Sequence, residues 1–355
     1  MISQISCEEL RCAVVAQMSR GLRHSAKWLA VLLAEVSEQQ QKQQATGSTT
    51  SSSPNTSNKY LRFGTSMDTD SPQVLLAKTY FDLGEYGRAA HALRNCRTSL
   101  NARALDATQA QTPANQKIDH KALFLRGYSL YLQGEKEKEQ LVAEATDPME
   151  RCKVVNKQLL PLAEELKELH TENALDAFGL YLYAMVLKAQ KINDAARSVL
   201  IQTVNAYPYL WCAWMDLAVL CDNKAQLRTL TAQLVDHWMK MFFATHALIE
   251  LPLTEGDASK SCLKLLRSIP CSHSKAQLAM AHYNSQEYDA AKELFAELLE
   301  QDPFRLEGMD SYSNILFVEA DSAALSTLAH AAVKIDKFVL HCQLLVVSTS
   351  CTTYI

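Results

Sequence analysis

The sequence lacks the short motifs that carry most enzyme chemistry. It contains no GxxxxGK[ST], GxGxxG, GxSxG or HExxH pattern, which excludes the common phosphate-binding loops, nucleophile elbows and helix-borne zinc sites. It also contains no CxxC pair, and its ten cysteines are scattered along the chain. We therefore expect no catalytic residue, no cofactor and no metal, and we predict that the protein is not an enzyme.

Two groups of cysteine and histidine residues come closest to a site. Cys262, Cys271 and His273 are near one another in sequence, but tetrahedral zinc needs four ligands and no second pair follows at a suitable spacing. His237 and His246 lie in the apolar run HWMKMFFATHALIEL, where packing or surface histidines are the more common case. A thiol or zinc hydrolase is therefore the weakest of the functions considered.

Charge and hydropathy exclude other classes. The net charge is -4, so no basic excess points to nucleic acid, and no apolar run reaches the roughly 20 residues that cross a bilayer. The first residues carry Glu8 and Glu9 where a secretory signal would carry positive charge. We expect a soluble protein with reduced thiols in the nucleus and cytoplasm. The carboxylates of Glu164 and Glu165 are expected on a solvated helix face.

Composition along the chain predicts four segments. Ser6 and Glu9 resemble a capping box that opens one helix, and a second helix is predicted from about Ser25 to Val36. A stretch rich in glutamine, serine and threonine follows, which has too few apolar residues to fold. The predicted divisions are N-terminal helices at 1–37, a disordered low-complexity linker at 38–71, helical repeats at 72–338 and a divergent tail at 339–355.

The central segment repeats itself. Pairs of alanines twelve residues apart recur, and in the later copies a large apolar residue and then a proline follow the second alanine. The alanine pairs are Ala77 with Ala89, Ala184 with Ala196, and Ala279 with Ala291. The residues that follow them are Leu200 and Phe295, then Pro208 and Pro303.

This spacing has a physical reason. Two antiparallel helices approach closely only where both present a small side chain, and a proline ends the second helix. Ala218 follows Ala184 by 34 residues, which is the tetratricopeptide period. Pro270 ends a weaker unit, Gly127 and Gly134 suit the first helix and the turn of a unit that begins near His120, and residues 309–332 form a degenerate unit. The predicted fold is an all-α tetratricopeptide-repeat superhelix.

Such superhelices bind partners along the first helices of their units. The expected groove positions are Tyr181, Met185, Met215, Val219 and Met280. These side chains are mostly apolar, whereas a repeat protein that grips a peptide carboxylate needs lysine, arginine and asparagine. A partner helix therefore fits better than the alternative function of a generic peptide-binding adaptor such as a co-chaperone.

Several strings outside the repeat pattern point to one family. They are RGLRHSAKWLAVLLAE, LAKTYFDLGEYGRAAHALRNC, GLYLYAMVLKAQ, YLWCAWMDL, HWMKMFFATH, QDPFRLEGMDSYSNILFVEADS and LAHAAVKIDKF. In this order, from Arg20 to Phe338, they resemble the subunit 8 family (cell-division-cycle 23 type) of the anaphase-promoting complex, or cyclosome, a ubiquitin ligase of the cell cycle. The resemblance implies a non-catalytic scaffold that supports ubiquitin-dependent proteolysis and mitosis, binds other subunits, and forms a homodimer through its N-terminal repeats.

The last residues depart from that family. After KIDKF the sequence VLHCQLLVVSTSCTTYI has no repeat spacing, as a truncated product would show. In the family the coactivator binds to repeats that follow this point, which puts coactivator binding by this chain in doubt. An array without a polar last unit is also expected to expose apolar surface near residues 325–355 and to aggregate.

Overall fold

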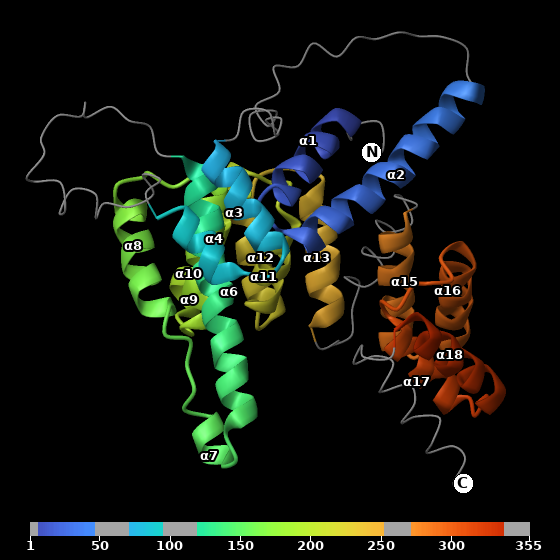
Figure 1. The fold of residues 1–355 in the computed structure, drawn as a ribbon. Helices are drawn as coiled ribbons and strands as arrows, with labels where there is room; N and C mark the ends of the chain where they lie inside the picture. The colour runs from blue at the N-terminus through green and yellow to red at the C-terminus, as the bar shows by residue number, and fades with distance from the viewer. Residues whose placement is uncertain (1–5, 47–70, 95–118, 252–270, 337–355) are drawn as a thin grey trace, which may run out of the picture. The chain divides into compact units, whose positions relative to one another are not determined.

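The structure is a computed structural model that describes residues 6–46, 71–94, 119–251 and 271–336 (Figure 1). Within these ranges every regular element is an α-helix, so the predicted all-α fold is confirmed. The helices are α1 (Cys7–Met18), α2 (Arg23–Thr46), α3 (Pro72–Asp82), α4 (Tyr86–Ala92), α6 (His120–Glu144), α7 (Pro148–Arg151), α8 (Leu159–Thr171), α9 (Ala177–Ala189), α10 (Asn193–Ala206), α11 (Trp211–Val219), α12 (Lys224–Gln233), α13 (Met239–Glu250), α15 (Ser272–Asn284), α16 (Tyr288–Gln301), α17 (Met309–Val318) and α18 (Ser322–Ile335).

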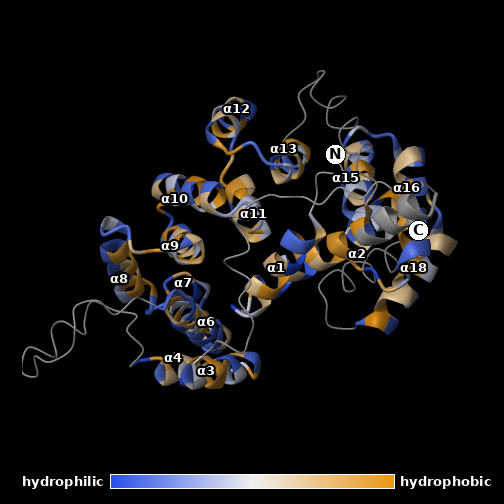
Figure 2. Cartoon of the chain, turned by 90° about the horizontal axis from the view of Figure 1, so that it is seen from above, coloured by the Kyte–Doolittle hydropathy of each residue, from blue (hydrophilic) through white to orange (hydrophobic). Residues whose placement is uncertain are grey.

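The chain divides into two compact units. The N-terminal unit comprises Ser6–Cys221 and Arg228–Lys240, and the C-terminal unit comprises Asp222–Leu227 together with the described residues from Met241 onward. In the N-terminal unit, α3 and α4, α6, α8, α9, α10 and α11 follow one another along an arc when seen from above (Figure 2). Helices α1 and α2 lie in the mouth of that arc. The division into the four predicted segments stays a prediction.

Successive helices are joined by one recurring turn. After α3, α9, α15 and α17, one residue adopts a left-handed conformation and the next residue donates a backbone hydrogen bond across the turn. The left-handed residues are Gly84, Lys191, Gln286 and Ala320, with φ of 77°, 63°, 61° and 57°. The hydrogen bonds run to the residue five positions earlier and measure 2.9 to 3.0 Å, as in a Schellman motif. The turn thus satisfies the carbonyl groups that a helix end leaves without a partner.

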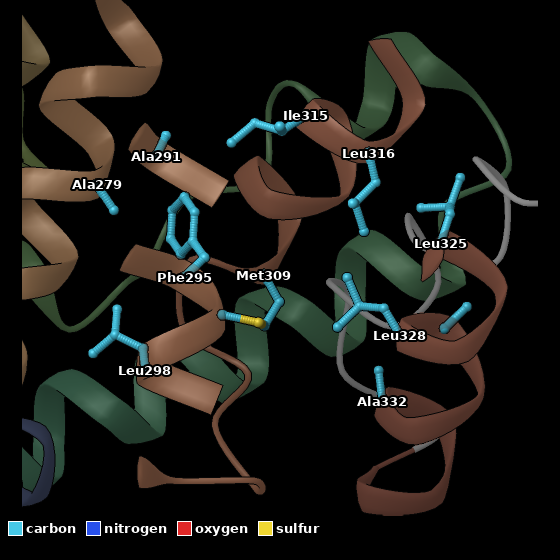
Figure 3. Packing of buried hydrophobic residues seen from close by; sticks show 11 residues of the cluster. Ala279, Ala291, Phe295, Leu298, Met309, Ile315, Leu316, Leu325, Leu328 and Ala332 are labelled. Atoms are coloured by element: carbon cyan, nitrogen blue, oxygen red, sulfur yellow. The ribbon is translucent and has the colours of Figure 1, made fainter. Parts of the chain in front are cut away.

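The alanine pairs lie where each helical hairpin crosses. Ala77, Ala89, Ala196, Ala279 and Ala291 are fully buried, and Ala184 is 1% exposed. Helices α3 with α4, α9 with α10, and α15 with α16 pack against each other at these positions. In the C-terminal unit, Ala279 and Ala291 share one cluster with Phe295, Leu298 and Met309, which joins α15 and α16 to α17 (Figure 3).

The remaining packing residues also occupy defined places. Leu200 and Phe295 are 1% and 0% exposed, and Ala218 is 9% exposed. Pro208 and Pro303 each follow the end of a second helix, Pro208 buried and Pro303 exposed. Pro270 and the second-helix pattern that it ends lie outside the described residues.

The predicted turn at Gly134 is wrong. Helix α6 runs without interruption from His120 to Glu144, and Gly134 lies buried inside it. A Cβ at this position would lie 1.9 Å from Oδ1 of Asn156, whose side-chain amide donates to the carbonyl oxygen of Tyr131 at 3.1 Å. Gly134 is therefore needed for close approach of the returning chain, not for a turn.

Two other local expectations need correction. Helix α2 ends at Thr46, well past Val36, so residues 38–46 are helical where the linker was expected to begin. Glu165 is not solvated, because its side chain is only 14% exposed and pairs with Arg126 at 2.8 Å across α6 and α8. Glu164, the neighbouring carboxylate, is exposed as expected.

Candidate functional site

The five predicted groove residues differ in unit and in exposure, and the groove itself stays a prediction. Met280 belongs to the C-terminal unit, where it packs against buried residues, and the other four belong to the N-terminal unit. Met185 and Met215 are half-buried, and Val219 is 71% exposed. Tyr181 is only 5% exposed, so it is not available to a ligand.

Tyr181 is held in a small polar network between α9 and α11. Its hydroxyl donates to Oδ2 of Asp216 at 3.1 Å, and Lys188 donates to Oδ1 of the same carboxylate. Burial, with the Cys212 and Asp216 side chains nearby, raises the pKa of Tyr181 well above its usual value. Because Lys188 is already paired, it is not a free cation for gripping a peptide carboxylate, and nothing in this region favours the co-chaperone alternative.

The inner side of the N-terminal unit is occupied by its own first two helices. We call α1 and α2 the N-terminal hairpin. Its Arg20 guanidinium lies 3.9 Å from the centre of the Phe178 ring on α9, and its Trp28 stacks on Trp211 of α11 with ring centres 4.2 Å apart. Cation–π and stacked aromatic contacts of this kind each contribute about 1 kcal/mol.

Hydrogen bonds fix the register of the hairpin on the array. The side-chain amide of Gln17 donates to the carbonyl oxygen of Tyr209 at 2.8 Å, and the Tyr209 hydroxyl donates to the carboxylate of Glu9. The backbone NH of Cys212 donates to Oγ of Ser25 at 3.2 Å. These bonds join residues separated by 187 to 200 positions, so they are tertiary contacts that no local sequence pattern encodes.

The turn of the hairpin reaches α3. Gly21 has a φ of 79°, and a Cβ there would lie 2.2 Å from the Phe81 ring, so only glycine allows this approach. Next to it, Arg23 pairs with Asp82 at 2.7 Å. We call Phe81, Phe178, Tyr209, Trp211 and Cys212 the hairpin-binding face.

Part of the predicted capping box is present at the start of the hairpin. Oγ of Ser6 accepts from the backbone NH of Glu9 at 3.3 Å and caps α1. The carboxylate of Glu9 accepts from Tyr209, a contact that the capping pattern did not indicate. Ser6 starts the helix, and Glu9 helps to place it on the array.

Burial shifts the pKa values of titratable side chains in this unit. Burial raises the pKa of the Cys212 thiol to about 12, which leaves almost no nucleophilic thiolate at neutral pH. Burial lowers the pKa of His237 to about 4, and this residue precedes α13, where its Nδ1 accepts from the backbone NH of Met239 at 3.3 Å. Among the residues that the structure describes, no three metal-ligating side chains gather. No helix in those ranges is long and apolar enough to cross a membrane.

Sequence reasoning missed the hairpin-binding face. Its aromatic members include Phe178 and Trp211, which lie in the first turns of α9 and α11. The additional signal was a row of polar residues, Gln17, Arg20 and Ser25, in the helices before the repeats. Such residues are buried only when they have specific partners, and all three are at most 7% exposed here.

The hairpins, their shared turn and the spacing of their alanines define a helical-repeat protein of the tetratricopeptide type. Comparison with known families specifies it further. The model for anaphase promoting complex subunit 8 / Cdc23 matches residues 6–279, and the chain belongs to this family.

Individual relatives agree with the family match. The chain is similar to anaphase-promoting complex subunit 8 of Arabidopsis thaliana, with 36% identity over 363 residues that cover 95% of this chain and 58% of the plant protein. It is similar to the cell division cycle protein 23 homolog of Mus musculus, with 36% identity over 88% of this chain and 46% of the mouse protein. The protein named anaphase-promoting complex subunit 8 of Dictyostelium discoideum is 31% identical over 95% of this chain and 60% of its own length. The chain spans about half the length of the curated relatives it matches.

Proposed function

We propose that this chain is a non-catalytic scaffold subunit of the anaphase-promoting complex, or cyclosome, and that it supports ubiquitin-dependent proteolysis and mitotic progression by binding other subunits. The family match over residues 6–279 carries this proposal. The helical hairpins support it, because stacked hairpins offer long surfaces for protein partners.

The chemistry of the described residues supports a role without catalysis. The Cys212 thiol is a poor nucleophile because burial raises its pKa, and a buried thiol of this kind is expected to be inert. Thiol labelling at neutral pH tests this part of the proposal. Slow modification of Cys212 is expected, and fast labelling at Cys212 would revive the hydrolase alternative.

The scaffold role is tested by affinity purification of the tagged chain from dividing cells, followed by identification of the bound proteins. Other subunits of the complex should be recovered with it. Two matched variants supply the control, since Ala196 is fully buried and Ala195 is exposed. Ala195→Trp should retain the partners and Ala196→Trp should lose them. Recovery of the wild-type chain alone, as a monomer, would contradict the proposal.

We also propose that the chain forms a homodimer through its N-terminal repeats and works in nucleus and cytoplasm, as the family resemblance implies. The exposed apolar side chains at and just after α3, Leu75, Leu76 and Leu83, support a further contact on this part of the molecule. Mass photometry of the purified chain over a range of concentrations tests the dimer, and imaging of a tagged chain tests the location. A monomer at all concentrations would exclude the dimer.

A further inference from the structure

The contacts between the N-terminal hairpin and the array are of the kind found at binding interfaces. Gln17, Arg20 and Ser25 are 0%, 7% and 4% exposed, and two of them exchange hydrogen bonds with backbone groups of the array. Interfaces between separate partners combine such polar contacts with stacked aromatic anchors, which Trp28 and Trp211 supply here. The hairpin therefore resembles a bound helical ligand.

The helices that carry the hairpin-binding face have packing partners of their own. Helix α3 packs on α4 through Ala77 and Ala89, and α9 packs on α10 through Ala184 and Ala196. Neither crossing includes a residue of the hairpin. The array can thus keep its hairpin crossings when α1 and α2 move away, as displacement of a bound element requires.

The hairpin is held from one side. Val15, Met18 and Val31 are 39%, 58% and 41% exposed, so this side of the hairpin is partly open to solvent, whereas Leu10, Leu29 and Leu32 of the same helices are buried. Elements held by a few contacts on one side open at lower free energy than the rest of a fold. Opening of the hairpin would uncover the Phe178 and Trp211 rings together with the carbonyl oxygen of Tyr209.

From these observations we propose that the N-terminal hairpin is an autoinhibitory occupant of the hairpin-binding face. When it leaves, the face binds an amphipathic partner helix. That helix presents an amide to the carbonyl oxygen of Tyr209, an arginine to the Phe178 ring and an aromatic side chain to Trp211, as Gln17, Arg20 and Trp28 do. The hairpin and the partner compete for the same atoms.

Binding of a labelled peptide tests the competition. A fluorescein-labelled peptide with the sequence of residues 6–36 is titrated into the full wild-type chain and into the full chain carrying Gln17→Ala and Arg20→Ala. These substitutions weaken the internal hairpin and leave the hairpin-binding face intact. Loss of one hydrogen bond and one cation–π contact should raise the open population, so the peptide should bind the variant about tenfold more tightly or better. A chain with Arg11→Ala and His24→Ala, both at exposed positions of the hairpin, should bind as the wild type does.

Equal affinity of the peptide for all three chains would overturn the proposal. So would tight binding of a peptide that itself carries Gln17→Ala and Arg20→Ala, because the contacts would then not be specific. Hydrogen exchange on the wild-type chain gives a second test that does not depend on the folding of a variant. Backbone amides of α1 and α2 should exchange faster than those of α9 and α10, and exchange at a common rate would show that the hairpin opens only when the unit unfolds.

Discussion

At the scale of single residues, the alanine crossings set how closely two helices pack. Ala196 is fully buried between α9 and α10, whereas Ala195, one position earlier, is exposed. Ala196→Trp should therefore overpack the crossing and destabilise the unit by about 1 to 3 kcal/mol or more. Ala195→Trp should change the free energy of unfolding by less than about 0.5 kcal/mol. Urea unfolding followed by circular dichroism measures both, and equal effects would disprove the assigned register.

Buried histidines predict a loss of stability in acid. Burial lowers the pKa of His273 to about 3, whereas an unfolded histidine titrates near 6.5. Between about pH 3 and 6.5 the folded state therefore binds fewer protons than the unfolded state. The contribution of neutral His273 to the free energy of unfolding is complete above about pH 6.5 and is lost as the pH falls toward 3.

The size of this effect can be measured. Unfolding free energy of the C-terminal unit should fall by about 1 kcal/mol per pH unit between pH 6 and 4. His273→Leu should flatten that dependence, and His330→Leu, at an exposed position of α18, should keep the wild-type slope. The same steep slope in His273→Leu would show that other groups control the acid response.

At the scale of elements, three of the four turns between paired helices are strained, because Lys191, Gln286 and Ala320 are left-handed residues that carry a Cβ. Ala320 has a φ of 57°, in the left-handed region where a Cβ is unfavourable, whereas Gly84 occupies the same place after α3. Ala320→Gly should thus stabilise the α17–α18 hairpin by about 0.5 to 1 kcal/mol. Ala331→Gly, at an exposed position within α18, should instead cost about 1 kcal/mol. The midpoint temperatures of thermal unfolding of the two variants should shift in opposite directions relative to the wild type. Shifts of the same sign would contradict the conclusion that the turn at Ala320 is strained.

The same elements show what a sequence can reveal. The spacing of Ala184 and Ala196 predicts one hairpin correctly because both helices and their turn lie within 30 residues. The prediction of a turn at Gly134 was wrong because glycine occurs both in turns and where two segments of the chain approach closely. The contact that requires it comes from Asn156, beyond the end of the same helix, and no periodic pattern encodes such a contact.

At the scale of the whole molecule, the hairpin-binding face was the least predictable feature. Trp28 and Trp211 stack although they are far apart in the chain, and each could equally well be an ordinary core residue of its own helix. Repetitive patterns describe how neighbouring units pack, but they do not indicate which surface an extra pair of helices will cover. The position of the N-terminal hairpin on the array could therefore be learned only from the structure.

The two units lead to a final prediction, because each has its own buried residues. The N-terminal unit contains all four tryptophans of the sequence, which are Trp28, Trp211, Trp214 and Trp238. Tryptophan fluorescence should therefore follow only that unit, whereas circular dichroism follows the helices of both. Leu200 and Phe295 occupy equivalent repeat positions in the two units and are both buried.

Substitution at these two positions separates the units. Leu200→Ala should lower the stability seen by fluorescence by about 2 to 5 kcal/mol. Phe295→Ala should lower a transition seen by circular dichroism by about 3 to 5 kcal/mol and leave the fluorescence transition in place. A fluorescence midpoint that moves as far in Phe295→Ala as in Leu200→Ala would mean that the units unfold as one, because only strong coupling transmits the loss of a buried ring to the other core.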